Sequence, residues 1–343
     1  MHETLTPRRR PTMKDVAMLA GVGLKTVSRV VNEEGGVSPQ IVEKVTSAIA
    51  SLRYSPDQRA GSLRRGDKKT GTIGLVVSSV ANPFAAAVHK AVEDAAARRG
   101  TAVLAASLDD DPLRERRIVD ALLGRRVDGL ILTTVARSQA YLLTEQEFGT
   151  PLVFIDRAPI GIDGDTVLSN NSEGAEKATN HLLKQGHKRI AYLGDRLDIR
   201  SAQARHQGYL RAIGRAGIAT SAVQIIDDLH SEEAACQASL RLFTSPDAPT
   251  AVFSSQNLVT IGVIRALRQL NLHRTIAVVG FDDFPLADLL EPAVTVVAQR
   301  PETIGAVAAE CLFRRLDGAE AKNEIHMIDT DLIVRGSGEI PPS

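Results

Sequence analysis

Carboxylate, amide and guanidinium side chains recur in the later part of this 343-residue chain, each close behind a short apolar run. They are Asn82 and Phe84, Asp109, Thr133 and Thr134, Asp156 and Arg157, Asp195, Gln256 and Asn257, and Asp282 and Asp283. Taken singly, such residues serve as helix caps or turn residues. If the apolar runs are parallel strands, their carboxyl ends face a common crevice where ligands bind. As a set, these side chains therefore predict a polar small-molecule site.

A second group of residues lies near the N-terminus, where Thr12 to Asn32 read TMKDVAMLAGVGLKTVSRVVN. Two short amphipathic helices joined by Gly-Val-Gly predict a helix-turn-helix, whose second helix enters the major groove of DNA. The side chains predicted to project from that helix are Leu24, Lys25, Ser28, Arg29 and Asn32. Their chemistry suits contacts with base edges and phosphates.

Three helices must supply a small core for this unit. Thr12 and Asp15 form a start signal for the first helix, and Ser38 followed by Pro39 does so for the third. Gly21 lets the chain turn sharply after the first helix. The residues predicted to be buried are Met13, Val16, Ala17 and Ala20 in the first helix, Val27, Val30 and Val31 in the second, and Ile41, Val42, Val45, Ile49 and Leu52 in the third.

Charge is distributed unevenly along the chain, although the formal net charge is zero. Residues 1–70 hold 13 Lys and Arg against 7 Asp and Glu, while the remaining residues hold 28 against 34. A basic N-terminal unit on an acidic body favours a segment that neutralises phosphates, with binding that weakens as salt rises. The run Arg8 to Arg10 is either a solvated tail or an arm that grips phosphates.

From Thr72 onward, short apolar runs alternate with amphipathic helices. The runs TIGLVV, TAVLAAS, VDGLILTT, PLVFID, RIAYLGD, AVQIID, TAVFSSQ and TIAVVGFDD are predicted strands. Helices are predicted between them, for example over 85–99 and 113–125. This alternation predicts an α/β fold with parallel sheets, and about 270 residues divide better into two lobes than into one.

The stretch from Thr12 through Leu63 resembles the headpiece of the LacI/GalR family of bacterial transcription regulators. The segments DVAMLAGVGLKTVSRVVN, VSPQIVEKV and YSPDQRAGSL follow the family's order and spacing, and the likeness continues through the body. The resemblance implies base-reading roles for Leu24, Lys25 and Arg29. It implies phosphate contacts for Thr12, Thr26, Ser28 and Asn32. Gly23 departs from the usual Ser, so it offers no hydroxyl to a phosphate.

Residues 55–69 form a basic linker whose large apolar side chain is Leu63. In the family this segment is a hinge helix on operator DNA, and the resemblance implies that Ala60 and Leu63 enter the minor groove there. The alternative is that Leu63 packs on the headpiece. Asp57 and Gly61 replace the usual Asn and a helix former, so we expect this hinge to depend on DNA for folding.

The body resembles the family's two-lobed effector domain, which is related in fold to periplasmic sugar-binding proteins. The resemblance implies that ligand lies between the lobes, where carboxylates and guanidinium groups bind vicinal hydroxyls. The implied effector-binding residues are Asn82, Phe84, Asp109, Asp156, Arg157, Ser201, Arg205, Gln256, Asp282 and Gln299. Ala85 replaces a second aromatic residue, which removes part of a stacking platform and favours a pentose or nucleoside over a hexose. The alternatives are a purine, a phosphorylated sugar or a phosphoprotein co-effector.

These expectations divide the chain into a headpiece over 1–55, a hinge and linker over 56–71, an effector domain over 72–336 and a tail over 337–343. Within the effector domain, the N-lobe is predicted to hold about 72–167 and 300–324. The C-lobe is predicted to hold about 168–299 and 325–336. A homodimer on a near-palindromic operator is expected, because one headpiece offers little contact. The tail has no apolar heptads for a tetramer.

Other functional classes fit the sequence less well. A sugar kinase would need a glycine-rich phosphate site, and the chain has no GxxxxGK[ST], HExxH, paired CxxC or GxSxG motif. An exported solute-binding protein would carry a signal segment and no basic headpiece. We therefore expect no enzyme activity, cofactor, metal or membrane partner. We expect the protein to be cytoplasmic. Cys236 and Cys311 are predicted to be buried free thiols.

Overall fold

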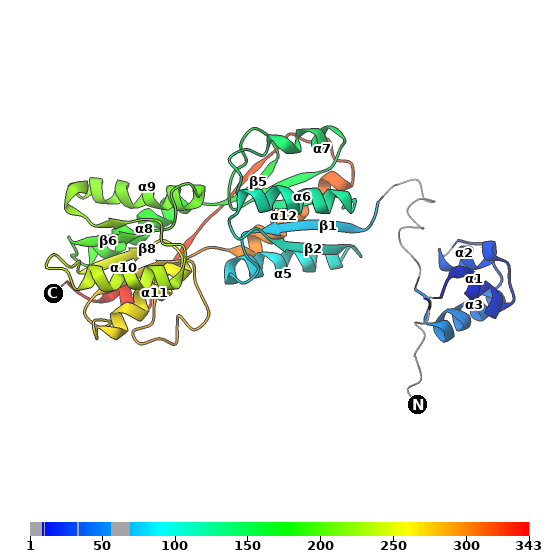
Figure 1. The fold of residues 1–343 in the computed structure, drawn as a ribbon, viewed down its shortest axis with the longest axis horizontal. Helices are drawn as coiled ribbons and strands as arrows, with labels where there is room; N and C mark the ends of the chain where they lie inside the picture. The colour runs from blue at the N-terminus through cyan, green and yellow to red at the C-terminus, as the bar shows by residue number, and fades with distance from the viewer. Residues whose placement is uncertain (1–8, 10, 33, 56–68, 343) are drawn as a thin grey trace, which may run out of the picture. The chain divides into compact units, whose positions relative to one another are not determined.

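The computed structural model describes residues 9, 11–32, 34–55 and 69–342, and the chain divides between Thr70 and Gly71 into two compact units. The N-terminal unit, the headpiece, holds α1 (Met13–Ala20), α2 (Leu24–Val31) and α3 (Pro39–Leu52) (Figure 1). Gly21 ends α1 in the left-handed region with φ 66°, as the turn prediction requires. Val16, Val27, Val45 and Ala48 form its buried core. Val42, which was predicted to be buried, is 38% exposed, because Ala48 rather than Val42 faces α1 and α2.

The second unit, the body, contains two six-stranded sheets, one in each lobe. The first lobe holds β1 (Thr72–Val77), α5 (Pro83–Ala97), β2 (Ala102–Ser107), α6 (Pro112–Gly124), β3 (Leu130–Thr133), η1 (Ala140–Leu142), α7 (Leu143–Glu147), β4 (Leu152–Ile155), β5 (Asp165–Ser169), α12 (Pro301–Leu316) and β11 (Ile325–Ile328). Its strand order is β11-β5-β4-β3-β1-β2, and all pairs are parallel. The α/β prediction with parallel sheets is confirmed for this lobe.

The second lobe repeats this plan. It holds α8 (Asn171–Lys184), β6 (Ile190–Leu193), α9 (Arg200–Arg215), η2 (Thr220–Ala222), β7 (Ile225–Ile226), α10 (Glu232–Phe243), β8 (Ala251–Ser254), α11 (Asn257–Gln269), β9 (Ala277–Phe281), β10 (Thr295–Ala298), β12 (Asp331–Ile333) and η3 (Ser337–Glu339). Its strand order is β12-β10-β9-β8-β6-β7, which matches the first sheet position by position, except that β12 runs antiparallel to β10. Both sheets carry helices on both faces, as parallel sheets require.

The chain passes between the lobes three times, after β5, after β10 and after β11. The assignment of 325–336 to the second lobe is wrong for Ile325–Ile328, because β11 pairs with β5 and completes the first sheet. Likewise, 337–342 is not a separate tail. Ser337 is buried in the second lobe, where its hydroxyl donates to the Val278 carbonyl oxygen at 2.6 Å.

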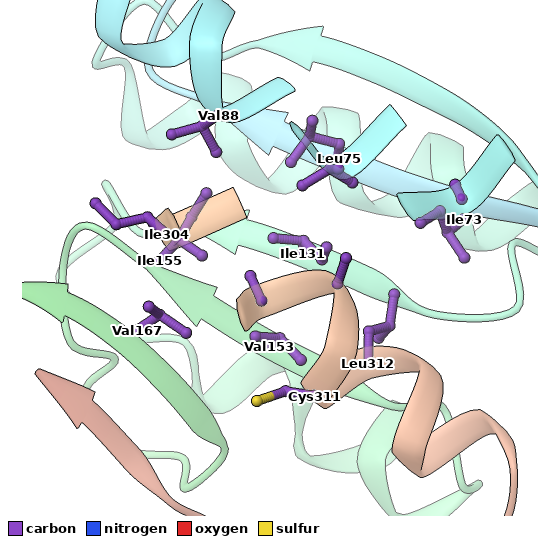
Figure 2. Close-up of a cluster of buried hydrophobic side chains, with 14 of the residues drawn as sticks. Ile73, Leu75, Val88, Ile131, Val153, Ile155, Val167, Ile304, Cys311 and Leu312 are labelled. Atoms are coloured by element: carbon purple, nitrogen blue, oxygen red, sulfur yellow. The ribbon is translucent and has the colours of Figure 1, made fainter. Parts of the chain in front are cut away.

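The core of the first lobe joins residues that are far apart in the sequence (Figure 2). Ile304 and Leu312 of α12 pack with Val88 of α5 and with Leu75 and Ile131 of the sheet. Gly305 permits this approach, since a Cβ there would lie 2.6 Å from the Val88 carbonyl oxygen. Cys311 belongs to this core, and it and Cys236 are buried free thiols as predicted. Within the described ranges, no helix combines the length and apolar character needed to cross a membrane.

Candidate functional sites

The second headpiece helix presents the predicted base-reading side chains to solvent. Leu24 is 40% exposed, Lys25 is exposed, and Arg29 is partly exposed. The Arg29 guanidinium lies beside Gly36, and its Nε is 4.0 Å from Glu34 Oε2. The side chain of Arg29 is therefore held near the helix surface by a weak, exposed ion pair that DNA can replace. The base-reading roles of these residues stay predictions.

Three of the predicted phosphate-binding side chains already have partners within the headpiece, namely Thr12, Ser28 and Asn32. The Thr12 hydroxyl and backbone N–H both donate to Asp15 Oδ2 at 2.7 Å. These bonds hold the pKa of the Asp15 carboxyl below its usual value. The Asn32 amide donates to Ser28 Oγ at 3.3 Å. Thr12 can therefore donate to a phosphate only if it gives up its bond to Asp15, since a hydroxyl has one proton.

Three further expectations concern the headpiece and its linker. Gly23 caps α2 without a side-chain hydrogen bond, as its lack of a hydroxyl dictates. Thr26 lies in the first turn of α2 and is partly exposed. The proposed minor-groove residues Ala60 and Leu63 fall outside the residues that the structure describes.

A cavity of about 390 Å³ lies at the carboxyl ends of the strands of both lobes. All ten residues predicted to bind effector line it: Asn82, Phe84, Asp109, Asp156, Arg157, Ser201, Arg205, Gln256, Asp282 and Gln299. The structure thus brings together side chains that are up to 217 residues apart in the sequence, counting from Asn82 to Gln299. Their role in ligand binding stays a prediction.

The first lobe contributes Asp156 and Arg157, which directly follow β4. Asp156 has φ 65°, and its N–H donates to the Val167 carbonyl oxygen at 3.0 Å. Burial raises the pKa of the Asp156 carboxyl and outweighs the attraction of Arg157 and Arg205. A carboxyl held in this way gains a hydrogen bond when a ligand hydroxyl approaches it.

Arg157 is nearly buried and is bound by the lobe itself. Its Nη1 donates to Asp110 Oδ1 at 2.6 Å and to the Thr134 carbonyl oxygen at 3.4 Å. Burial lowers the pKa of this guanidinium, but Asp110 and Asp156 more than compensate, so the pKa is raised. Arg157 is therefore a fixed positive charge at the wall of the cavity.

The second lobe fixes Arg205 through three acceptors. Its Nε donates to Asn171 Oδ1 at 2.7 Å, and its Nη1 donates to the Ser255 carbonyl oxygen at 2.7 Å and to Asp282 Oδ2 at 3.3 Å. The guanidinium carbon also lies 3.9 Å from the centroid of the Phe281 ring. These contacts leave little rotational freedom to a long side chain, so the Arg205 guanidinium is held in one position at the wall of the cavity.

Gln299 links the second sheet to the chain that crosses between lobes. Its amide nitrogen donates to Asp282 Oδ1 at 2.6 Å. The Gln299 Oε1 is buried and accepts no hydrogen bond from any residue in the described part of the chain. Buried polar atoms are almost always paired, so an unpaired acceptor at the wall of a cavity is an exception.

Sequence reasoning missed two ionisable residues of the cavity, Asp110 and His230. His230 Nδ1 lies 2.8 Å from Asp195 Oδ1, and its Nε2 lies 3.6 Å from Asp110 Oδ2. Asp110 stands next to Asp109 and follows the same strand, so its position carried a signal. His230 was missed because the strand was predicted to run to Asp227, whereas β7 ends at Ile226 and the loop after it carries His230 into the cavity.

A helix-turn-helix on a basic unit, followed by two lobes with a polar cleft, defines a ligand-controlled DNA-binding regulator. Comparison with known proteins agrees. The family model for bacterial regulatory proteins of the lacI family matches residues 12–57, and that for a periplasmic binding protein-like domain matches 179–338. The chain belongs to the lacI family of bacterial regulatory proteins, and it is a transcription repressor whose DNA binding a ligand controls.

Two curated relatives cover almost the whole chain. The ribose operon repressor of Escherichia coli K12 is 34% identical over 330 residues, which are 95% of this chain and 99% of the relative. The HTH-type transcriptional repressor PurR of Mannheimia succiniciproducens is 31% identical over 329 residues, which are 95% of this chain and 98% of the relative.

Solved structures agree with the family assignment. The lac repressor dimer bound to operator and the anti-inducer ONPF has a TM-score of 0.83 at 27% identity and covers 96% of this chain and 99% of its own. The complex of the transcriptional regulator CelR with cellobiose has a TM-score of 0.69 at 32% identity. It covers 96% of this chain and 100% of its own.

Proposed function

We propose that this repressor responds to a pentose, with D-ribose the first candidate, bound in the cleft between its lobes. The observation that carries the proposal is the set of buried acceptors around Asp156, Asp282 and the unpaired Gln299 Oε1. Such a set suits a ligand that presents several hydroxyl donors. The near-full-length likeness to a ribose operon repressor supports the same class of ligand.

The cavity disfavours the other ligands that the sequence left open. Phe84 is the lining residue with a large aromatic ring, so a purine or nucleoside base would stack on one side at most. The cavity lining holds five carboxyl groups, those of Asp109, Asp110, Asp156, Asp195 and Asp282, against the guanidinium groups of Arg157 and Arg205, and this excess of carboxyls disfavours a phosphate. A phosphorylated sugar therefore ranks below an uncharged pentose.

Control of DNA binding follows from linkage between ligand and lobe closure. A ligand shifts operator affinity only by its different affinities for the arrangements of the lobes. We propose a homodimer that presents two headpieces to a near-palindromic operator. Exposed apolar side chains such as Leu104 on the edge strand β2, and Leu286 and Leu289 on the second lobe, support a subunit interface on the body.

We further infer that the protein acts in the cytoplasm and by binding rather than by turnover. Its relatives are transcription repressors. The ionisable groups of the cleft are paired with one another, as Arg157 is with Asp110 and Arg205 with Asp282. Such pairing suits recognition of a ligand.

A thermal-shift series on the full chain tests the effector. D-ribose, D-xylose, D-glucose, inosine, hypoxanthine and ribose 5-phosphate are added in turn. At 100 times its Kd, a ligand of the folded state adds about 2.7 kcal/mol, and this raises Tm by roughly 5–10 °C. Operator binding is then measured by fluorescence anisotropy with and without the ligand that raises Tm.

D-ribose or D-xylose should raise Tm and change operator affinity, while ribose 5-phosphate should not. A Tm increase with hypoxanthine or ribose 5-phosphate alone would overturn the pentose assignment. If D-ribose raises Tm but leaves operator affinity unchanged, the control mechanism is wrong.

A further inference from the structure

Two pairs of side chains meet across the cleft, each with one member from each lobe. Asn82 at the start of α5 and Asn257 at the start of α11 exchange amide hydrogen bonds of 3.2 and 3.4 Å. Asp110, behind β2, faces His230, behind β7, with 3.6 Å between Asp110 Oδ2 and His230 Nε2. The first pair carries no charge, whereas the second depends on the charge of an imidazole.

Both ends of the second pair are fixed within their own lobes. Asp110 Oδ1 accepts from Arg157 at 2.6 Å, which orients this carboxylate toward the cleft. Asp195 accepts from His230 Nδ1 at 2.8 Å with one oxygen and from the Gln256 amide at 2.9 Å with the other. The imidazole is thereby aimed at the opposite lobe.

The partners of His230 dictate its protonation. Ionised carboxylates only accept hydrogen bonds, and a neutral imidazole has a single N–H. With Asp195 on Nδ1 and Asp110 on Nε2, a neutral ring would turn one lone pair toward a carboxylate. A ring that carries both protons satisfies the two partners at once.

We propose that His230 and Asp110 form a proton-dependent bridge that holds the two lobes closed, with Asp195 as the residue that orients the imidazole. The bridge forms in the ligand-free body whenever its lobes close, and it is broken when they open. Its effect on the effector rests on the proposed function, because a pentose that binds the closed lobes favours the protonated form of His230.

The charges around His230 fix the direction of the pH dependence. The hydrogen bond to Asp195 raises the pKa of His230 above its usual value of 6.5, burial lowers it, and the charge of Asp110 raises it further. Arg196 is the cation that opposes protonation. A raised pKa means that the bridge is complete below the ordinary pKa and is lost as pH rises through the raised value. Closure is therefore favoured at acidic pH.

Histidine NMR on the ligand-free full chain tests the bridge itself. The protein is labelled with 13C at the histidine Cε1 position, and the His230 signal is identified by its loss in His230→Gln. We expect the midpoint of its titration to lie above 6.5 and to be lower in Asp110→Asn than in the unsubstituted protein, because the charge of Asp110 raises the pKa of His230. A midpoint in Asp110→Asn that equals that of the unsubstituted protein would overturn the proposal.

Calorimetric titration with D-ribose tests the consequence for the effector. Because the closed lobes hold the pKa of His230 higher than the open lobes do, the affinity for D-ribose should fall by about threefold or more as pH rises from 6 to 9. His230→Gln should abolish this slope. Asn257→Ala is the matched control, because losing the uncharged pair should weaken binding equally at every pH. If the pH dependence of D-ribose affinity persists in His230→Gln, the bridge does not control effector binding. If D-ribose does not bind at all, the proposed function fails, while the NMR result still decides the bridge.

Discussion

Asp156 and Asp282 occupy equivalent positions in the two lobes. Each follows the third strand from the outer edge of its sheet, with φ 65° and 67°, and each donates its N–H to the next strand, at Val167 and at Val297. A left-handed turn at this point directs the carboxyl side chain into the cleft. The repeated plan of the sheets therefore delivers a pair of carboxylates to one cavity.

The two carboxyls differ in their surroundings. Asp282 accepts hydrogen bonds from Arg205 and Gln299, whereas burial is the largest influence on Asp156, and this predicts the effect of Asp156→Asn. Burial raises the pKa of Asp156, so ionising it costs stability as pH rises from the ordinary value of 3.8 through the raised one. Asp156→Asn should raise Tm at pH 7 by roughly 2–4 °C for each kcal/mol of that cost. The difference should vanish at pH 3.5. Scanning calorimetry at both pH values measures it, and a lower Tm at pH 7 would refute this account of burial.

Arg205→Ala should remove the effector response. Loss of the hydrogen bonds from a charged donor costs about 1.5–3 kcal/mol, or roughly 10- to 100-fold in affinity for D-ribose. Operator binding without ligand should stay within about threefold. Arg200→Ala is the matched control, since Arg200 is exposed on the same helix α9. An unchanged ribose affinity in Arg205→Ala, measured by calorimetry, would remove Arg205 from the site.

Arg29→Ala should relax sequence preference at one base pair of each operator half-site. The expected cost is about 1–3 kcal/mol on the preferred operator. On operators altered at that base pair the cost should be small. Anisotropy titrations at one fixed salt concentration give the comparison. If Arg29→Ala weakens binding equally on every sequence, Arg29 contacts phosphate and reads no base.

Gly208→Ala should destabilise the second lobe. A Cβ at Gly208 would overlap the Ser172 carbonyl oxygen and lie 2.9 Å from Ala175 Cβ, at the contact of α9 with α8. Overpacking of this kind costs about 1–3 kcal/mol. Gly214→Ala, in the same helix but with nothing within 4 Å, should instead gain about 0.5–1 kcal/mol. Urea unfolding distinguishes them, and equal effects would mean that α8 shifts freely to make room.

Local sequence signals predicted many of the elements and much of the cleft. Apolar runs located β1–β4 and β6–β9 but not β5, β10, β11 or β12. The position of Asp156, Asp282 and Gln256 behind strands marked them as cleft residues. Arg205 and Gln299 entered only through the family resemblance, because no local pattern separates an inward-facing Arg on α9 from the other basic residues of that helix.

Contacts between segments that are distant in the sequence could not be predicted from local patterns. The sequence analysis placed Ile325 in the second lobe and predicted no strand there, and the parallel pairing of Ile325 with Thr166 in the first lobe is decided by tertiary packing. The bridge between Asp110 and His230 was not predicted for the same reason, because the two residues are 120 residues apart and come into contact only when both sheets are formed.

The three passages of the chain between the lobes have a consequence for biosynthesis. Helix α12 supplies Ile304, Ala308 and Leu312 to the core of the first lobe, yet these residues are translated after almost the entire second lobe. Until then, α5 supplies Val88 and Val92 to the sheet face that holds Leu75 and Ile131, but the contacts of α12 with this face are missing. The core of the first lobe therefore cannot be completed until α12 is synthesised, and part of its apolar surface stays exposed to solvent until then. During this interval we expect the nascent protein to bind chaperones and to aggregate most readily.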